Sequence, residues 1–137
     1  MNITLKPSEI NNDKSFLAFE LYDLNNSKPI GDIYTLNENL TDGFFYINIK
    51  VNNYFESDSY IIEIKECIVN FLKIAFKCWP INKIYINCYN NEINLINLIS
   101  NIGFKCEADL KEDYYVNGKF INKEIFAIYR KEVINEW

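Results

Sequence analysis

A predicted strand, a long amphipathic helix and a second strand follow one another in the middle of the chain, and this order constrains the fold more than any other feature. Apolar and polar residues alternate in FFYINIKV (44–51), which predicts a strand with one buried face. Apolar residues then recur at helical spacing, so we expect a helix that Asp58 or Ser59 caps and Pro80 ends. KIYINCYN (83–90) is the next predicted strand. A crossover of this length predicts a parallel βαβ unit.

Predicted hairpins lie on both sides of this unit. The first comprises FLAFELYDL and IGDIYTL, and the second surrounds Asn117-Gly118, a dipeptide typical of tight hairpin turns. A second helix precedes the second hairpin, and Gly103 suits the left-handed position after its last turn. These elements have the predicted bounds 16–24, 30–36, 92–102, 104–116 and 120–133. We therefore expect an α/β (α+β) domain over residues 1–137, with a mixed, mostly antiparallel sheet and helices on its faces.

Charge and composition exclude several classes of function. The formal net charge of −5 argues against a nucleic-acid-binding protein, because such a protein needs a basic face. The first residues have no signal-peptide pattern, and no apolar segment approaches the length of a membrane span, so we expect a cytoplasmic protein. The sequence contains no histidine, which excludes catalysis by a Ser-His-Asp or Cys-His arrangement.

The cysteines predict no metal site. The chain has 4 cysteines and no C-x-x-C pair, so a zinc site would need all of them to converge. We interpret them instead as small buried apolar residues in a reducing compartment. They are Cys67, Cys78, Cys88 and Cys106.

Three segments resemble the GNAT superfamily of N-acetyltransferases, particularly its branch that acetylates protein N-termini and small amines. NLINLISNIGFKCEADLKEDYYVNGKFINKEIFAIYRKE resembles the family's second helix with its "klGF" end and the hairpin that follows. IGDIYTL is similar to the family's "iGeigl" strand, and LKIAFK to its "ldyaF" at the end of the long helix. The resemblance extends from about Ile30 to Arg130 and implies the GNAT fold.

The resemblance also implies acyl transfer, most simply of an acetyl group from acetyl-CoA to a primary amine of a small molecule or peptide N-terminus. In such enzymes the pantetheine arm of acyl-CoA binds the exposed backbone of a central strand, and the pyrophosphate lies at the start of the long helix. The implied cofactor-binding residues here are Ile47, Ile49, Val51, Ser57, Ser59, Tyr60, Ile61, Asn90 and Asn91.

Candidate catalytic groups lie near the same strands. The family commonly uses a tyrosine or serine on the second helix to protonate the leaving thiolate, and Tyr89 and Ser100 are the nearest candidates. Tyr46 could present a base beside the central strand, as could Glu20, Glu38 and Asn48. The simpler explanation of Tyr46, Asn48, Glu20 and Glu38 is that each is an ordinary polar residue of a strand or loop.

The cofactor loop departs from the family pattern. No glycine occurs between Gly43 and Gly103, although the family's loop needs glycines so that backbone N–H groups can surround the phosphates. Glu56 and Asp58 would repel a pyrophosphate at the start of the helix. The positions of the family's serine and tyrosine fall on Leu95 and Ile99, which carry no proton donor.

The acceptor side departs from the pattern as well. Only PSEINNDKS stands where the family has one or two helices between its first strand and the hairpin. That side is therefore open or is supplied by a partner chain, either a second copy or a paralogous GNAT protein. A second hypothesis thus remains beside the enzyme: a catalytically silent GNAT-like domain that acts as a binding or assembly partner.

Overall fold

The computed structural model describes residues 2–8, 15–52 and 58–134, with the backbone alone at Asp58, Ser59 and Tyr114. The elements in chain order are β1 (Ile3–Pro7), β2 (Ala18–Asp23), β3 (Lys28–Asn39), β4 (Phe44–Val51), α1 (Asp58–Cys78), β5 (Lys83–Tyr89), α2 (Ile93–Ile102), β6 (Lys105–Val116), β7 (Lys119–Tyr129) and α3 (Arg130–Val133).

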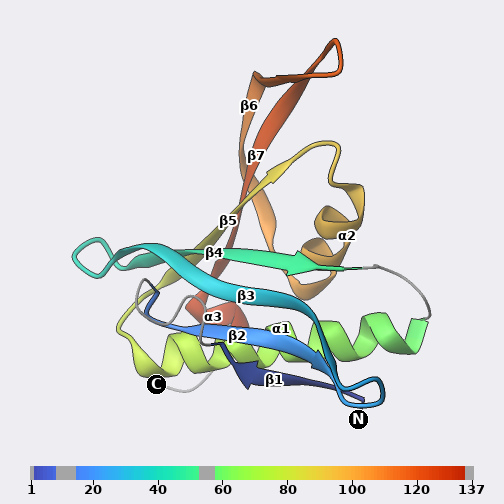
Figure 1. The fold of residues 1–137 in the computed structure, drawn as a ribbon. Helices are drawn as coiled ribbons and strands as arrows, with labels where there is room; N and C mark the ends of the chain where they lie inside the picture. Colours follow the sequence, from blue (N-terminus) through green and yellow to red (C-terminus); the bar gives the residue numbers. More distant parts are fainter. Residues whose placement is uncertain (1, 9–14, 53–57, 135–137) are drawn as a thin grey trace.

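Within this described part of the chain, the strands form one 7-stranded sheet in the order β1-β2-β3-β4-β5-β7-β6. Only β4 and β5 pair in parallel, and every other neighbouring pair is antiparallel. The β6–β7 hairpin projects beyond the rest of the sheet, and α1 lies across one face (Figure 1). The expected mixed sheet with a parallel βαβ unit is confirmed.

The hydrophobic core lies between the sheet and α1. Strand β4 buries alternate side chains, from Phe45 to Val51, against this helix. The apolar stripe of α1 faces them, and both α2 and α3 contact α1. The buried helical residues are Ile64, Cys67, Ile68, Phe71, Leu72, Ala75 and Phe76 of α1, and Leu95, Leu98 and Ile99 of α2.

The turns follow the chemistry of their residues. Asn117 and Gly118 have φ values of 50° and 77°, as a tight two-residue hairpin requires. Gly103 has a φ of 129° and its N–H donates to the carbonyl of Ile99, which closes α2 as expected. Helix α1 begins at Asp58, so the residue that precedes it lies outside the described residues.

Two predictions from the sequence are wrong: that all the cysteines are buried, and that the last strand continues to residue 133. Cys78 and Cys106 are exposed, because Cys78 occupies the last turn of α1 and Cys106 lies on the outermost strand of the sheet. The last strand ends at Tyr129, and residues 130–133 form the short helix α3. At this point the Glu132 carboxylate accepts the backbone N–H of Tyr129 at 3.0 Å, which favours a helical turn over further strand pairing.

Among the described helices, none combines the length and apolar character that crossing a membrane requires.

Candidate functional site

Strands β4 and β5 are paired at one end and separate at the other. Their parallel pairing reaches Ile47 on β4 and Ile86 on β5 and then stops, although β4 continues to Val51. The other edge of β4 remains paired with β3 as far as Val51. The β5-facing backbone edge of residues 48–51 therefore pairs with no described strand, and it presents hydrogen-bonding groups to a gap in the middle of the sheet.

A cavity of about 620 Å³ opens where the two strands separate. Buried Ile86 and Leu95 give it an apolar interior, whereas the exposed Asn87, Asn91 and Glu92 make its mouth polar. Such a mixture of apolar walls and a few polar groups is typical of small-molecule sites. The lining residues are Asn48, Ile49, Ile86, Asn87, Tyr89, Asn91, Glu92, Leu95, Val116 and Ile121.

A tight turn from β5 into α2 holds a carboxylate at the mouth of the cavity. The Glu92 N–H donates to the Tyr89 carbonyl at 2.9 Å, and the Glu92 carboxylate accepts the Tyr89 N–H at 2.8 Å. Glu92 is the N-cap of α2, where the helix dipole stabilises a negative charge. This turn therefore fixes one oxygen of the Glu92 carboxylate against the end of β5.

The thiol next to the cavity is not a nucleophile. Cys88 is fully buried beside Tyr89, and burial raises the pKa of its thiol to about 12, with further contributions from the charges of Glu92 and Glu124. A thiol with this pKa stays protonated at neutral pH and has no thiolate to react. Cys88 therefore offers no nucleophile at neutral pH.

The structure places the predicted cofactor-binding residues in different environments. Ile49 and Asn91 line the cavity, while Ile47 and Val51 point into the core and flank the backbone edge that the prediction invoked. Asn90 is exposed, and its N–H donates to the Asn122 carbonyl at 2.9 Å. Tyr60 and Ile61 are half-buried in the first turns of α1, Ser57 lies outside the described residues, and only the backbone of Ser59 is described.

Of Tyr46, Tyr89 and Ser100, the structure brings Tyr89 alone to the cavity, which Asn48, named above as a further candidate, also lines. Tyr46 packs on Tyr85, with ring centroids 5.0 Å apart and an interplanar angle of 28°. Ser100 lies on the exposed side of α2. Their chemical roles remain predictions, but their positions make Tyr89 the best-placed proton donor of the three.

Sequence reasoning missed several cavity residues. Glu92 was predicted only as the first residue of a helix. Glutamate is not a residue type that marks an N-cap, so no local signal showed that its carboxylate accepts the Tyr89 N–H of β5. Val116 and Ile121 come from the projecting hairpin, and the Asn117-Gly118 turn signal already implied that they lie close together across it. No local pattern reveals that the hairpin also forms a wall of this cavity.

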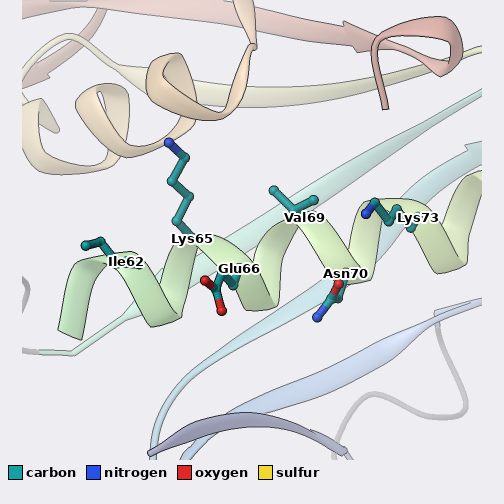
Figure 2. A pocket seen from close by; sticks show the side chains of 6 residues that line it. All are labelled: Ile62, Lys65, Glu66, Val69, Asn70 and Lys73. Atoms are coloured by element: carbon teal, nitrogen blue, oxygen red, sulfur yellow. The ribbon is translucent and has the colours of Figure 1, made fainter. Parts of the chain in front are cut away.

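A second hollow of about 450 Å³ runs along the outer face of α1 (Figure 2). Lys65 extends toward α2, whereas Glu66 and Asn70 point to the opposite side of the helix. All its residues belong to one helix, so it does not combine chemical groups from different elements. They are Ile62, Lys65, Glu66, Val69, Asn70 and Lys73.

Nowhere in the described residues do three or more metal-ligating side chains gather in a way that would hold a metal ion.

Comparison with solved structures shows the fold. The spermidine N-acetyltransferase from Vibrio cholerae in complex with CoA and spermine has 19% sequence identity and a TM-score of 0.74, covering 91% of this chain and 74% of that protein. The ribosomal-protein-S5-alanine acetyltransferase from Vibrio fischeri has 14% sequence identity and a TM-score of 0.71, covering 90% of this chain and 66% of that protein. No protein-family model and no curated protein sequence matches the chain. The chain thus has the fold of the GNAT N-acetyltransferases.

Proposed function

We propose that this protein is an acyl-CoA-dependent N-acyltransferase that transfers an acetyl group to a primary amine of a small molecule or peptide N-terminus. The separation of β4 from β5 carries this proposal, because it leaves a backbone edge beside a cavity of about 620 Å³. An amide-containing pantetheine chain can complete the hydrogen bonds that the missing strand pairing leaves open. Structurally similar proteins include one solved with CoA and spermine, which fits a thioester donor and an amine acceptor.

The chain's own residues suit a direct transfer. The backbone of residues 48–51 would orient the pantetheine arm and the thioester. The amine nitrogen would attack the thioester carbonyl, forming the amide bond as the carbon–sulfur bond breaks. Tyr89 would donate its phenolic proton to the leaving thiolate, and Glu92 at the cavity mouth would take the proton that the amine loses, through water.

Binding of acetyl-CoA is the first test, by calorimetry or thermal shift. A ligand at a hundred times its Kd should raise the free energy of unfolding by ~2.7 kcal/mol. Release of free CoA with a panel of primary amines would then identify the acceptor. If millimolar acetyl-CoA does not stabilise the protein, the proposal that it is an acyl-CoA-dependent enzyme is wrong.

The second candidate function is a silent GNAT-like domain that pairs with a second copy or a paralogous GNAT protein. Two observations favour it. Residues 52–57 contain no glycine and include Glu56, and Asp58 is the first residue of α1; the buried Leu95 and Ile99 stand where the family has a serine and a tyrosine. If charge repulsion limits CoA binding, exchanging Glu56→Arg and Asp58→Gly together should strengthen it. A micromolar Kd for acetyl-CoA in the unchanged protein would contradict this candidate in its simplest form.

A further inference from the structure

Three aromatic rings cluster on the face of the sheet that no described helix covers. Strand alternation directs Phe45 and Ile47 toward α1, and both α2 and α3 pack into the same core. The intervening residues of β4 and β5 therefore lie on the opposite face. We call the rings of Phe44, Tyr46 and Tyr85 on that face the aromatic cluster.

The rings of the aromatic cluster hold one another in place. Tyr46 and Tyr85 are partners in the parallel pairing of β4 with β5, and their rings stack. The Phe44 ring meets both of them edge-on, with centroid distances of 5.9 Å to Tyr46 and 5.4 Å to Tyr85. All three side chains are only half-buried. The cluster is therefore a preformed apolar surface that remains partly in contact with solvent.

The aromatic cluster is continuous with the cavity between β4 and β5. Asn48 follows Tyr46 by two residues on β4, and Asn87 follows Tyr85 by two residues on β5, so both asparagines lie on the face of the cluster. Both also line the cavity, and the Asn48 side-chain amide donates to the Tyr34 hydroxyl at 3.2 Å. Two residues along a strand span about 6.5 Å. A ligand with its amino group in the cavity can therefore reach the cluster through a short spacer.

The charges beside the aromatic cluster are already matched. Lys83 Nζ lies 2.6 Å from Glu107 Oε1 and 4.6 Å from the centroid of the Tyr85 ring. The Tyr129 hydroxyl donates to the other carboxylate oxygen of Glu107 at 2.9 Å. A second ammonium group over the cluster would thus meet the positive charge of Lys83 beside a carboxylate that already has partners. The surroundings favour an uncharged, apolar group at this position.

We propose that the acceptor is an arylalkylamine, a primary amine joined to an aromatic ring by roughly two carbon atoms, as the spacing along β4 and β5 requires. The choice of an amine rests on the proposed transfer reaction, and the choice of a ring rests on the aromatic cluster. The amino group would lie beside Asn48 and Asn87 in the cavity. The ring would pack on Tyr46 and Tyr85, which buries apolar surface that an aliphatic diamine does not have.

Phenethylamine is the probe, and butylamine and diaminobutane are matched amines without a ring. Binding is followed by backbone amide chemical shifts in an amine-free buffer, with and without CoA. We expect saturable shifts with phenethylamine at Tyr46, Asn48, Tyr85 and Asn87, and at least tenfold weaker binding of both aliphatic amines. Equal affinity for the three amines, or no saturable shift with phenethylamine, would overturn the proposal.

Tyr46→Thr removes one ring of the cluster and keeps a β-branched residue that suits a strand. Tyr22→Thr is the matched control, because Tyr22 is another half-buried strand tyrosine and does not line the cavity. We expect Tyr46→Thr to weaken phenethylamine binding at least tenfold and to leave butylamine binding unchanged. If Tyr46→Thr remains folded by its amide spectrum and binds phenethylamine as tightly as the control, the assignment is wrong.

Measurements of CoA release separate this inference from the proposed function. Tyr46→Thr should raise the KM for phenethylamine with little change in kcat, because the ring contact is the same in the ground state and the transition state. Equal kcat/KM for all three amines would leave the transfer reaction standing and refute the preference for a ring. Binding of phenethylamine at the cluster in a protein that neither binds nor consumes acetyl-CoA would refute the transfer reaction and leave the ring-binding surface standing.

Discussion

At the scale of single residues, the cysteines divide into two chemically different pairs. Cys67 and Cys88 are buried, and burial raises the pKa of their thiols to about 11 and about 12, with further contributions from neighbouring carboxylates. Cys78 and Cys106 are exposed. Partial burial and the charge of Glu124 also raise the pKa of Cys106. The thiolate is the reactive form, so burial and protonation both protect the first pair.

Alkylation with iodoacetamide at about pH 8 should therefore modify Cys78 first and Cys106 more slowly. Cys67 and Cys88 should react only after unfolding in denaturant. Peptide mass spectrometry over a time course measures this order, with the denatured protein as control. Rapid labelling of Cys88 in the folded protein would contradict its complete burial.

Of the described glycines, Gly31 is the one at which an added Cβ atom would come nearest to a neighbouring atom. Gly31→Ala would place a Cβ atom 2.1 Å from the Lys50 carbonyl oxygen, so β3 and β4 would have to move apart. We expect a loss of about 1–3 kcal/mol in the free energy of unfolding, the usual cost of overpacking. Urea denaturation measures it, and Ser100→Ala on the exposed side of α2 is the control. An unchanged midpoint would contradict the close approach of the two strands.

At the scale of elements, local sequence patterns predicted most of the fold. Alternation in β4, the apolar stripe of α1 and the Asn117-Gly118 turn are local signals, and each gave the correct element. The cavity depends instead on where pairing between β4 and β5 stops, which is a contact between distant segments. The exposed Cys106 shows the same limit, because the order of strands in the sheet decides which strand is outermost.

The cavity between β4 and β5 can be filled without touching the core. Asn87 is an exposed lining residue of β5, so Asn87→Trp should occupy the mouth and leave the fold intact. We expect it to weaken acetyl-CoA binding at least tenfold in calorimetry. The control Asn101→Trp adds the same side chain at the exposed end of α2, outside the cavity. Equal affinities for the two variants would place any acetyl-CoA site elsewhere.

At the scale of the whole molecule, the net charge of the protein opposes binding of acyl-CoA, the proposed ligand. The formal charge of −5 repels a polyanion such as acyl-CoA at long range, and only local contacts in the cavity can overcome this repulsion. Most proteins that bind polyanions have a net positive charge or a positive binding face, and their affinity falls as salt is added.

Acetyl-CoA binding should therefore tighten as salt rises from about 0.01 M to about 0.15 M, where the Debye length falls from about 30 Å to about 8 Å. Calorimetric titrations at constant pH measure this dependence, with uncharged pantetheine as a control that should respond little. A Kd that weakens steeply with salt would show that lysines, and not the cavity walls, supply most of the binding free energy.

The gap between β4 and β5 also has a consequence for solubility. It gives the sheet an internal edge, in addition to the two edges at β1 and β6. An unpaired strand edge is a template on which another chain can add a strand and begin a fibril. Here α2 and the β6–β7 hairpin border the gap, and their side chains leave room for a slender molecule beside β4. The walls that shape a ligand site thus also keep foreign β-strands away from this internal edge of the sheet.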